Sequence, residues 1–418
     1  MRATVSESPR LARFVRATRR AGAAAVDRAW AELIASGSPL VEATGTGRTD
    51  RIVTFVWRPG GRPTVATVYT PMADLTPAGT ALAPIGTTGV WYRTFRWSSS
   101  VRASYGFAPL ALPALSDPGS SWSAFVRSIR ADPLNPLRVR SGPNLYLSEV
   151  ALPDSPPQPW VADTGAVQGS EERLMFRSRR LGNRRSVWVT LPEGFGARRA
   201  VPNLVIVFDG AAYQDPIPAR RIVANLSAAG RIGATAVVLV DNAPNRRERE
   251  LADNPAFSRF LALELLPWLR RRFGLRPVAR RTVLAGSSLG GLAAASAALT
   301  FPRLFGAVLA QSGAFLASTG RPDGSSESIF ERFAAAPRAP VRFYLDAGTR
   351  ETVVPPGGTA SLLGGARHLR DVLRAKGYPV VYREFEGGHD YACWRGTFAD
   401  GLVHLLGARR RNRRRSGP

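Results

Sequence analysis

The chain has 418 residues, which is too long for a single compact core of ordinary size, and this length indicates two domains. Its 57 basic and 31 acidic residues give a formal net charge of +26. No nucleic-acid-binding motif accompanies this excess, so we expect the basic residues to be scattered over the surface and the protein to have no nucleic-acid partner. The single cysteine excludes an intramolecular disulfide, and the lack of an apolar leader or of about 18 consecutive apolar residues predicts a cytoplasmic protein without a membrane partner.

The first part of the chain has the pattern of a small β domain. We expect residues 1–25 to form a basic extension that is disordered in part, and residues 26–36 to form a short amphipathic helix. Runs rich in β-branched and aromatic residues follow at 52–57, 64–69, 90–97 and 102–107. Their spacing predicts a β-sandwich, and the proline-rich residues 109–160 predict a packed, extended connector that completes an N-terminal domain over residues 26–160.

From residue 168 to residue 407 the pattern alternates between strand and helix. Short apolar runs indicate strands at 187–191, 203–208, 234–240, 282–284, 307–310 and 341–345. Helical periodicity is clearest from Phe257 to Phe273. This alternation predicts a second, α/β domain over residues 168–407, with a mostly parallel sheet covered by helices on both faces. Residues 408–418 are expected to form a basic tail.

Ser288 lies in a Gly-x-Ser-x-Gly pattern, after the apolar run 283–285 and before a run of small residues. A strand before the pattern and a helix after it are typical of a nucleophile elbow, in which the serine backbone is strained and the glycines let strand and helix approach. We therefore predict that Ser288 is a nucleophile. The next residue, Leu289, opens the helix, where its backbone N–H is placed to stabilise an oxyanion.

A second oxyanion donor is expected from the loop after the strand at 203–208. Gly210 and Ala211 each offer a backbone N–H in that loop, and the sequence leaves both open.

A nucleophilic serine needs a base, and the base needs an orienting acid. His368 and His404 lie in helical patterns, whereas His389 lies in a glycine-flanked loop after the strand-like run 380–385. A histidine in a late loop, downstream of the serine, matches the chain order of α/β hydrolases. The sequence thus predicts His389 as the base and an α/β-hydrolase fold for the second domain.

The acid is expected between Ser288 and His389, just after a strand. Asp346 and Glu351 both meet this condition, and their spacing alone does not separate them. No GxxxxGK[ST] loop and no cluster of Cys and His occurs in the sequence, so we expect neither a cofactor nor a metal site.

Beyond these motifs, residues 26–407 resemble the enterochelin (ferric enterobactin) esterases. In the first half the resemblance rests on Val53–Arg58, Gly89–Thr94, Asp132–Pro136 and Leu152–Trp160. In the second half it rests on Phe208–Gly210, Arg247–Leu251, Glu264–Pro267, Ala285–Gly291, Gly348–Glu351 and Gly387–Asp390, the last followed by Trp394. The serine and histidine signatures are shared with many esterases, so the N-terminal set is the more specific one.

The resemblance implies a cytoplasmic serine esterase that opens the trilactone of an anionic ferric catecholate siderophore, such as enterobactin, and so releases iron. It implies Ser288 as nucleophile, His389 as base and Glu351, in preference to Asp346, as acid. It also implies that Arg247 meets the iron–catecholate head.

Tyr213 stands where the family has tryptophan, three residues after the Asp-Gly pair. Its ring is expected to stack on a catechol, but the changed residue leaves the identity of the siderophore open. The sequence does not indicate the oligomeric state.

Two other functions remain open at this point. A feruloyl-type carboxylesterase or an acyltransferase uses the same three residues on another acyl group. A non-catalytic protein that binds siderophores or other anionic ligands would keep a basic groove and tolerate loss of the serine.

Overall fold

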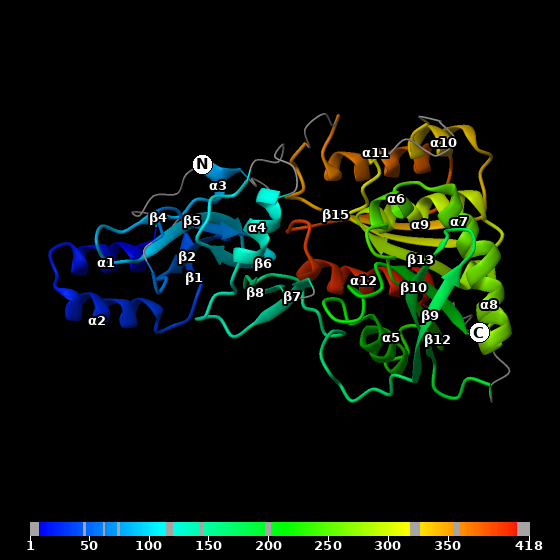
Figure 1. Ribbon diagram of the computed structural model, residues 1–418, viewed down its shortest axis with the longest axis horizontal. Coiled ribbons are helices and arrows are strands. Elements are labelled where there is room, and N and C mark those ends of the chain that lie inside the picture. Colours follow the sequence, from blue (N-terminus) through cyan, green and yellow to red (C-terminus); the bar gives the residue numbers. More distant parts are fainter. Residues whose placement is uncertain are drawn as a thin grey trace, which may run out of the picture. The chain divides into compact units, whose positions relative to one another are not determined.

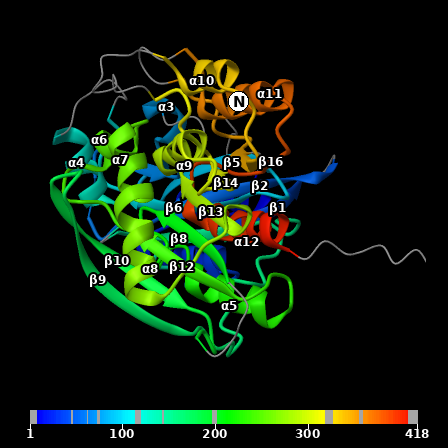
Figure 2. The same cartoon turned by 90° about the vertical axis from the view of Figure 1, so that its right-hand side faces the viewer.

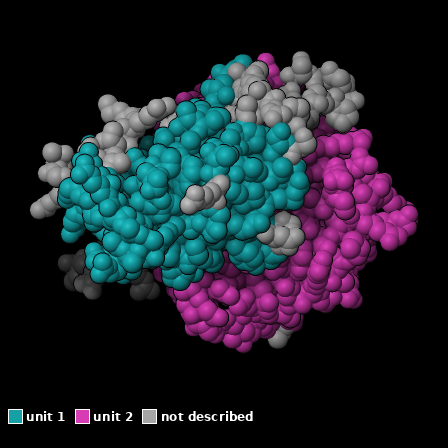
Figure 3. Space-filling view, turned by 60° about the vertical axis from the view of Figure 1, so that its left-hand side comes forward, with its two compact units in different colours: residues 1–157, 348–363, 384–393 teal, residues 158–347, 364–383, 394–418 magenta. Residues whose placement is uncertain are grey.

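The computed structural model describes residues 8–407 except 45–46, 62, 73–75, 114–119, 143–144, 197–201, 318–326 and 355–358. The predicted tail, residues 408–418, lies outside this description. The chain divides into two compact units (Figure 3). Unit 1 comprises residues 1–157, 348–363 and 384–393, and unit 2 comprises residues 158–347, 364–383 and 394–418.

Unit 1 is a sandwich of two four-stranded antiparallel sheets, as the sequence predicts. Aromatic rings from both sheets meet in its core, where Phe55 lies 4.6 Å from Tyr105 between ring centroids. The first sheet has the order β1 (Leu40–Thr44), β2 (Gly47–Trp57), β5 (Trp91–Ser98), β4 (Ala83–Pro84). The second has the order β3 (Thr67–Tyr69), β6 (Arg102–Ala108), β8 (Leu145–Ala151), β7 (Arg138–Gly142).

Helices α1 (Pro9–Thr18) and α2 (Ala23–Ile34) precede the sandwich and pack on each other (Figure 1). Within the predicted basic extension, residues 9–18 form α1, and residues 1–7 lie outside the described part of the chain. Ser8 caps this helix by accepting a hydrogen bond from the Leu11 N–H, and Leu11 and Phe14 are buried in a cluster with residues of β1 and β2. Arg13 and Arg16 are exposed, so the arginines that interrupt the apolar residues along the sequence leave the buried face of the helix intact.

The segment predicted as an extended connector contains more secondary structure than expected. Residues 109–160 include helix α4 (Ser120–Ser128) and strands β7 and β8, and a short helix α3 (Pro77–Thr80) lies earlier in the chain. Strand β8 pairs with β6, about forty positions upstream, with Tyr105 opposite Ser148. This pairing is non-local, so the residues of the segment itself carry little sign of it.

Unit 2 is built on an eight-stranded sheet, and its parallel centre agrees with the prediction. The two strands at one edge, β9 and β10, are antiparallel to their neighbours. The sheet has the order β16 (Val380–Phe385), β15 (Arg342–Gly348), β14 (Ala307–Gln311), β13 (Thr282–Ser287), β11 (Asn203–Phe208), β12 (Thr235–Val240), β10 (Asn183–Leu191), β9 (Ser170–Ser178).

Helices connect these strands and cover the sheet (Figure 2). The predicted helix 257–273 is present as α7, a π-helical turn and α8, and Phe176 of β9 packs against Trp268 of α8. The helical segments are α5 (Ala219–Ala228), α6 (Arg247–Leu251), α7 (Pro255–Phe260), η2 (Leu261–Leu265), α8 (Leu266–Phe273), η3 (Ala279–Arg281), α9 (Leu289–Thr300), α10 (Ile329–Ala335), α11 (Leu362–Ala375) and α12 (Tyr391–Leu406).

The centre of the sheet aligns the residues on which the site depends. Ser287 at the end of β13 pairs with Gln311 of β14, which pairs with Asp346 of β15. The carboxyl ends of these parallel strands therefore meet at one edge, where open α/β sheets bind ligands.

Candidate active site

Ser288 occupies a strained turn between β13 and α9. Its backbone has φ 56° and ψ −123°, a region that residues with a side chain rarely adopt. The Ser288 N–H donates to the Gln311 carbonyl at 2.9 Å, and its own carbonyl accepts from the Ala314 N–H at 2.9 Å. Such strain persists only where the surrounding structure holds it, and it is the conformation of a nucleophile elbow.

The need for glycine in the elbow is greatest on the strand side. A Cβ at Gly286 would lie 2.7 Å from the carbonyl carbon of Gly290, which no ordinary contact allows. A Cβ at Gly290 would lie 3.4 Å from its nearest neighbour, the Asp209 Oδ2, which is ordinary van der Waals contact. The prediction that both glycines are sterically required is therefore wrong for Gly290.

We expect Gly286→Ala to lower the free energy of unfolding by about 2 kcal/mol or more, because the new methyl group meets backbone that has little room to move. Gly290→Ala is the matched control, and its effect is expected to stay within about 1 kcal/mol. Urea unfolding of both variants and the wild-type protein measures the difference. Equal losses in the two variants would contradict this account of the elbow.

Leu289 is the first residue of α9 and is half-buried. The first N–H groups of a helix have no acceptor within it, and the helix start carries a partial positive charge. This position suits an oxyanion donor, as the sequence predicts for Leu289.

The two candidates for the second donor differ in the structure. The Gly210 N–H donates to the Val240 carbonyl at 3.0 Å, which contradicts its prediction as a donor because the group is already engaged. The Ala211 N–H donates to Asp241 Oδ1 at the longer distance of 3.3 Å, and this contact is exposed. Both N–H groups are thus engaged, but only the acceptor of Ala211 is a side chain, which can rotate away, so Ala211 is the better candidate.

Arg247 at the start of α6 forms a bidentate ion pair with Asp209. Its Nε and second terminal nitrogen donate to the two carboxylate oxygens at 2.7 and 2.8 Å, and Asn242 donates to the same carboxylate at 2.6 Å. Asp209 lies against the elbow helix, as its contact with a Cβ at Gly290 shows. The Arg247 side chain is 35% exposed, and Asp209 orients its guanidinium beside the elbow.

Tyr213 has a different position from the one predicted. It is fully buried, packs on Phe398, and donates its hydroxyl hydrogen to Gln311 Oε1 at 2.8 Å. A ring without exposed surface does not stack on a substrate, so the prediction for Tyr213 is wrong. The residue instead supports Gln311, whose carbonyl holds the backbone of Ser288.

Gln311 is a supporting residue that the sequence analysis missed. Its Nε2 donates to the Trp394 carbonyl at 2.7 Å and to Thr397 of α12, while its Oε1 accepts from Tyr213. A polar residue at the carboxyl end of a buried strand is the sequence feature that indicates a role near the site. The neighbouring Ser312 accepts a hydrogen bond from Trp394 Nε1 at 2.9 Å.

His389 and Glu351 come together in unit 1. His389 Nδ1 lies 3.7 Å from Glu351 Oε1, and the side chain of His389 is 34% exposed whereas that of Glu351 is 1% exposed. This distance is longer than a hydrogen bond. A buried carboxylate beside a partly exposed imidazole is the arrangement of an orienting acid and a general base.

Backbone hydrogen bonds join the loops that carry these two residues. The Thr349 N–H donates to the Phe385 carbonyl at 2.9 Å, and the Arg350 N–H donates to the Gly387 carbonyl at 3.0 Å. A Cβ at Gly348 would lie 2.5 Å from the Gly387 oxygen, so the close approach of the loops depends on glycine there.

The structure separates the two acids that the sequence left open. Glu351 faces His389, whereas Asp346 is fully buried and accepts a hydrogen bond from the Ser312 N–H at 3.2 Å. Asp346 thus supports the turn after β14, and Glu351 is the acid that faces the imidazole.

The two remaining histidines lie on helices, as predicted. His368 stacks edge-on against Phe330 at 4.5 Å. His404 packs near Tyr344, and burial, followed by Arg342 and Arg383, lowers its pKa.

The predicted site residues belong to different units. Ser288, Leu289, Ala211 and Arg247 belong to unit 2, and His389 and Glu351 belong to unit 1. Among the residues that the structure describes, no group of three or more His, Cys, Asp or Glu side chains is arranged to hold a metal ion. In the same part of the chain, no helix has the length and apolar character needed to cross a bilayer.

Two family models match the chain. The N-terminal enterochelin esterase model matches residues 52–161, and the Esterase model matches residues 178–405. Among curated proteins, an iron(III) enterobactin esterase of Dickeya dadantii is 30% identical over 414 residues, covering 90% of this chain and 92% of that protein.

Solved structures of similar proteins share the fold. Ferric enterobactin esterase from Salmonella typhimurium has a TM-score of 0.74 and 27% identity, with 90% of this chain and 98% of that chain covered. Enterobactin esterase from Shigella flexneri, crystallised in the presence of enterobactin, has a TM-score of 0.72 and 26% identity, with 88% and 96% covered.

Proposed function

The chain belongs to the enterochelin esterase family, and we propose that it hydrolyses the ester bonds of a ferric catecholate trilactone such as enterobactin, and so releases iron. We place this activity in the cytoplasm, where the single buried cysteine, Cys393, stays reduced. The bound iron is part of the substrate.

The strained backbone of Ser288 is the observation that supports this proposal most directly. A serine with positive φ, between a buried strand and a buried helix, costs about 1 to 3 kcal/mol in backbone strain. A nucleophile that must stand clear of the sheet explains it.

In the proposed reaction His389 accepts the hydroxyl proton of Ser288 as the Oγ attacks a lactone carbonyl carbon. Glu351 orients the imidazole and stabilises its positive charge. The backbone N–H groups of Leu289 and Ala211 stabilise the oxyanion, each by about 3 to 4 kcal/mol in comparable sites. The protonated His389 then gives its proton to the leaving alkoxide.

A water molecule completes the cycle. His389 removes one proton from it as its oxygen attacks the acyl-enzyme, and returns that proton to Oγ of Ser288 as the acyl–Oγ bond breaks and the free carboxylic acid leaves. Each turnover thus consumes one water and opens one ester bond.

Arg247 is the residue that we propose for substrate binding. A ferric tris-catecholate is anionic, and Arg247, whose side chain is held by Asp209 and is 35% exposed, attracts such a ligand without having to be ordered on binding. The excess of basic residues, with a net charge of +26, also favours the encounter at low salt.

The proposal is tested by mass spectrometry of the products after the full chain is incubated with ferric and iron-free enterobactin. We expect linear products heavier than the trilactone by one water for each bond opened. Parallel reactions with a feruloyl ester, and with an added alcohol acceptor, cover the alternative acyl chemistries. Faster cleavage of the feruloyl ester, or transfer to the alcohol in place of water, would replace the proposed function.

A further inference from the structure

The loop that carries His389 is bound by strand β6 through a buried carboxylate. Asp390, the next residue, is 2% exposed. Its Oδ2 accepts from the Ser104 N–H, and its Oδ1 accepts from the Ser104 hydroxyl at 3.1 Å and from the Ala392 N–H at 2.9 Å. Ser104 lies on β6 and is fully buried, so both ends of this contact are shielded from water.

A second contact fixes the backbone of His389 itself. Its N–H donates to the carbonyl of Pro71, just after β3, at 3.0 Å. A Cβ on the preceding residue, Gly388, would lie 2.0 Å from the same oxygen. The glycine therefore lets this segment of the sandwich approach the histidine backbone directly.

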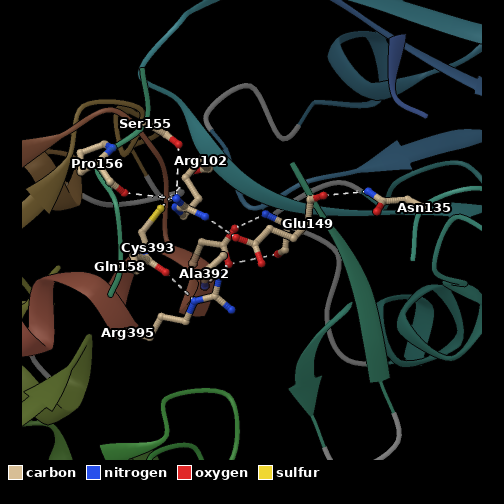
Figure 4. A network of polar contacts seen from close by, with 11 residues as sticks. Arg102, Asn135, Glu149, Ser155, Pro156, Gln158, Ala392, Cys393 and Arg395 are labelled. Atoms are coloured by element: carbon tan, nitrogen blue, oxygen red, sulfur yellow. Dashed lines mark hydrogen bonds and ion pairs between the residues drawn. The ribbon is translucent and has the colours of Figure 1, made fainter. Parts of the chain in front are cut away.

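Arg102, two residues before Ser104, holds the loop on both sides of His389. Its N–H donates to the Glu386 carbonyl at 3.3 Å, and its carbonyl accepts from the Cys393 thiol at 3.2 Å. Its guanidinium pairs with Glu149 of β8 and donates to Ser155 and the Pro156 carbonyl, which fixes Arg102 in turn (Figure 4). The only cysteine of the chain is thus a hydrogen-bond donor in this network.

We infer that the N-terminal sandwich is a positioning device for the general base, with Asp390 as its principal positioning residue. This inference rests on the proposed function, because it takes His389 as the base. Asp390 acts through the loop and does not touch the reacting atoms.

The loop that carries His389 has no fixed conformation of its own. Gly387 and Gly388 precede His389 and leave the backbone many conformations, whereas general-base catalysis tolerates misplacement of less than about 1 Å. Contacts from β6 and from the end of β3 remove that freedom. The same contacts agree with the assignment of residues 384–393 to the compact unit of the sandwich, although the first two of these residues end strand β16 of the large sheet.

Burial and hydrogen bonding have opposite effects on the pKa of Asp390. Burial raises the pKa of this carboxyl, and the hydrogen bonds from Ser104 and Ala392 act in the opposite direction. A buried carboxylate is tolerated because its oxygens are paired, so a change to either partner is strongly felt.

The test compares Asp390→Asn and Ser104→Ala with two matched controls from the same unit. Asp390→Asn turns an amide NH2 toward a donor, and we expect kcat to fall about tenfold to a hundredfold with KM changed less than about threefold. Ser104→Ala keeps the backbone donor, so we expect a smaller fall of about three- to tenfold. This milder variant keeps the test informative if Asp390→Asn does not fold.

The controls carry the same chemistry away from the loop. Asp132 is a buried aspartate that accepts from the Tyr105 hydroxyl at 2.8 Å, and Ser99 is a buried serine that donates to Asp154. Asp132→Asn and Ser99→Ala are expected to keep kcat within about threefold even where thermal stability falls. A loss of kcat that follows stability across all four variants would overturn the inference.

Hydrogen exchange supplies a readout that is independent of activity. Amides of residues 386–393 are expected to exchange at least about tenfold faster in Asp390→Asn than in Asp132→Asn, because the loop opens locally. Faster exchange with an unchanged kcat would also overturn the inference. If the wild-type protein cleaves no ester, the proposed function fails first; if it does and Asp390→Asn keeps full kcat, only this inference fails.

Discussion

Replacement of Ser288 by alanine is expected to lower kcat for trilactone cleavage by about 10⁵- to 10⁶-fold, to the level left by binding and the oxyanion donors alone. The methyl side chain has no oxygen to form the acyl-enzyme, so no other residue of the elbow takes over its role. KM or Kd for the ferric siderophore is expected to change little, because the hydroxyl is a small part of the binding surface. Product formation by mass spectrometry and binding by fluorescence quenching measure the two effects.

The neighbouring Ser287 is the matched control for this experiment. It is also a serine of the elbow sequence, but it lies at the end of β13 and is 3% exposed. Ser287→Ala is expected to keep kcat within about threefold. Cleavage that survives in Ser288→Ala, or that is lost only in Ser287→Ala, contradicts the assignment of the nucleophile. Retained binding with no cleavage in the wild-type protein would favour a binding protein instead.

Replacement of His389 by alanine is expected to lower kcat by about 10⁵-fold, because loss of the base alone costs nearly as much as loss of the whole catalytic set. Phosphonylation of Ser288 by a fluorophosphonate, in which Oγ attacks phosphorus and fluoride leaves, is expected to slow in parallel, since that reaction also needs the serine proton to be removed. The rate of labelling, followed by intact-protein mass spectrometry, measures this second effect. Replacement of His368 or His404 by glutamine provides controls of the same residue type, with kcat expected within about threefold.

Glu351 and Asp346 give a graded comparison with the histidine. Glu351→Gln is expected to lower kcat by about 10²- to 10⁴-fold, because the acid orients the base and stabilises its charge but carries no proton to substrate. Asp346→Asn is expected to affect stability more than kcat, since its carboxylate accepts from the Ser312 backbone. The reverse order of the two kcat losses would identify Asp346 as the acid.

The sequence carried much of the catalytic prediction because the relevant signals are local. Ser288 was recognisable from its own thirteen-residue neighbourhood, since a strand, a sharp turn and a helix of small residues leave their pattern in consecutive positions. The parallel centre of the large sheet was recognisable for the same reason. A central strand of such a sheet is buried on both faces, so its residues are apolar without interruption, as in Val205–Phe208.

Local patterns misled where a side chain's neighbours come from distant segments. The resemblance implied a substrate-stacking role for Tyr213, but its buried position is decided by contacts with Gln311 and Phe398, about a hundred residues or more away. Gly210 offers a backbone N–H in every conformation of its loop, and only the neighbouring strand β12 decides that Val240 accepts it. In α1, arginines interrupt the apolar residues along the sequence, and these residues form one buried face only when the segment is helical.

By itself, the sequence determined the type of chemistry, because nucleophile, base and the turn that strains the nucleophile are each written in short, contiguous motifs. Tertiary structure alone decided which carboxylate faces His389, which N–H groups are already engaged, and that the loop of His389 is held by Ser104 and Arg102. These choices depend on contacts between residues as far apart in the sequence as Ser104 and Asp390. Residues that meet over such separations leave no periodic pattern in the sequence.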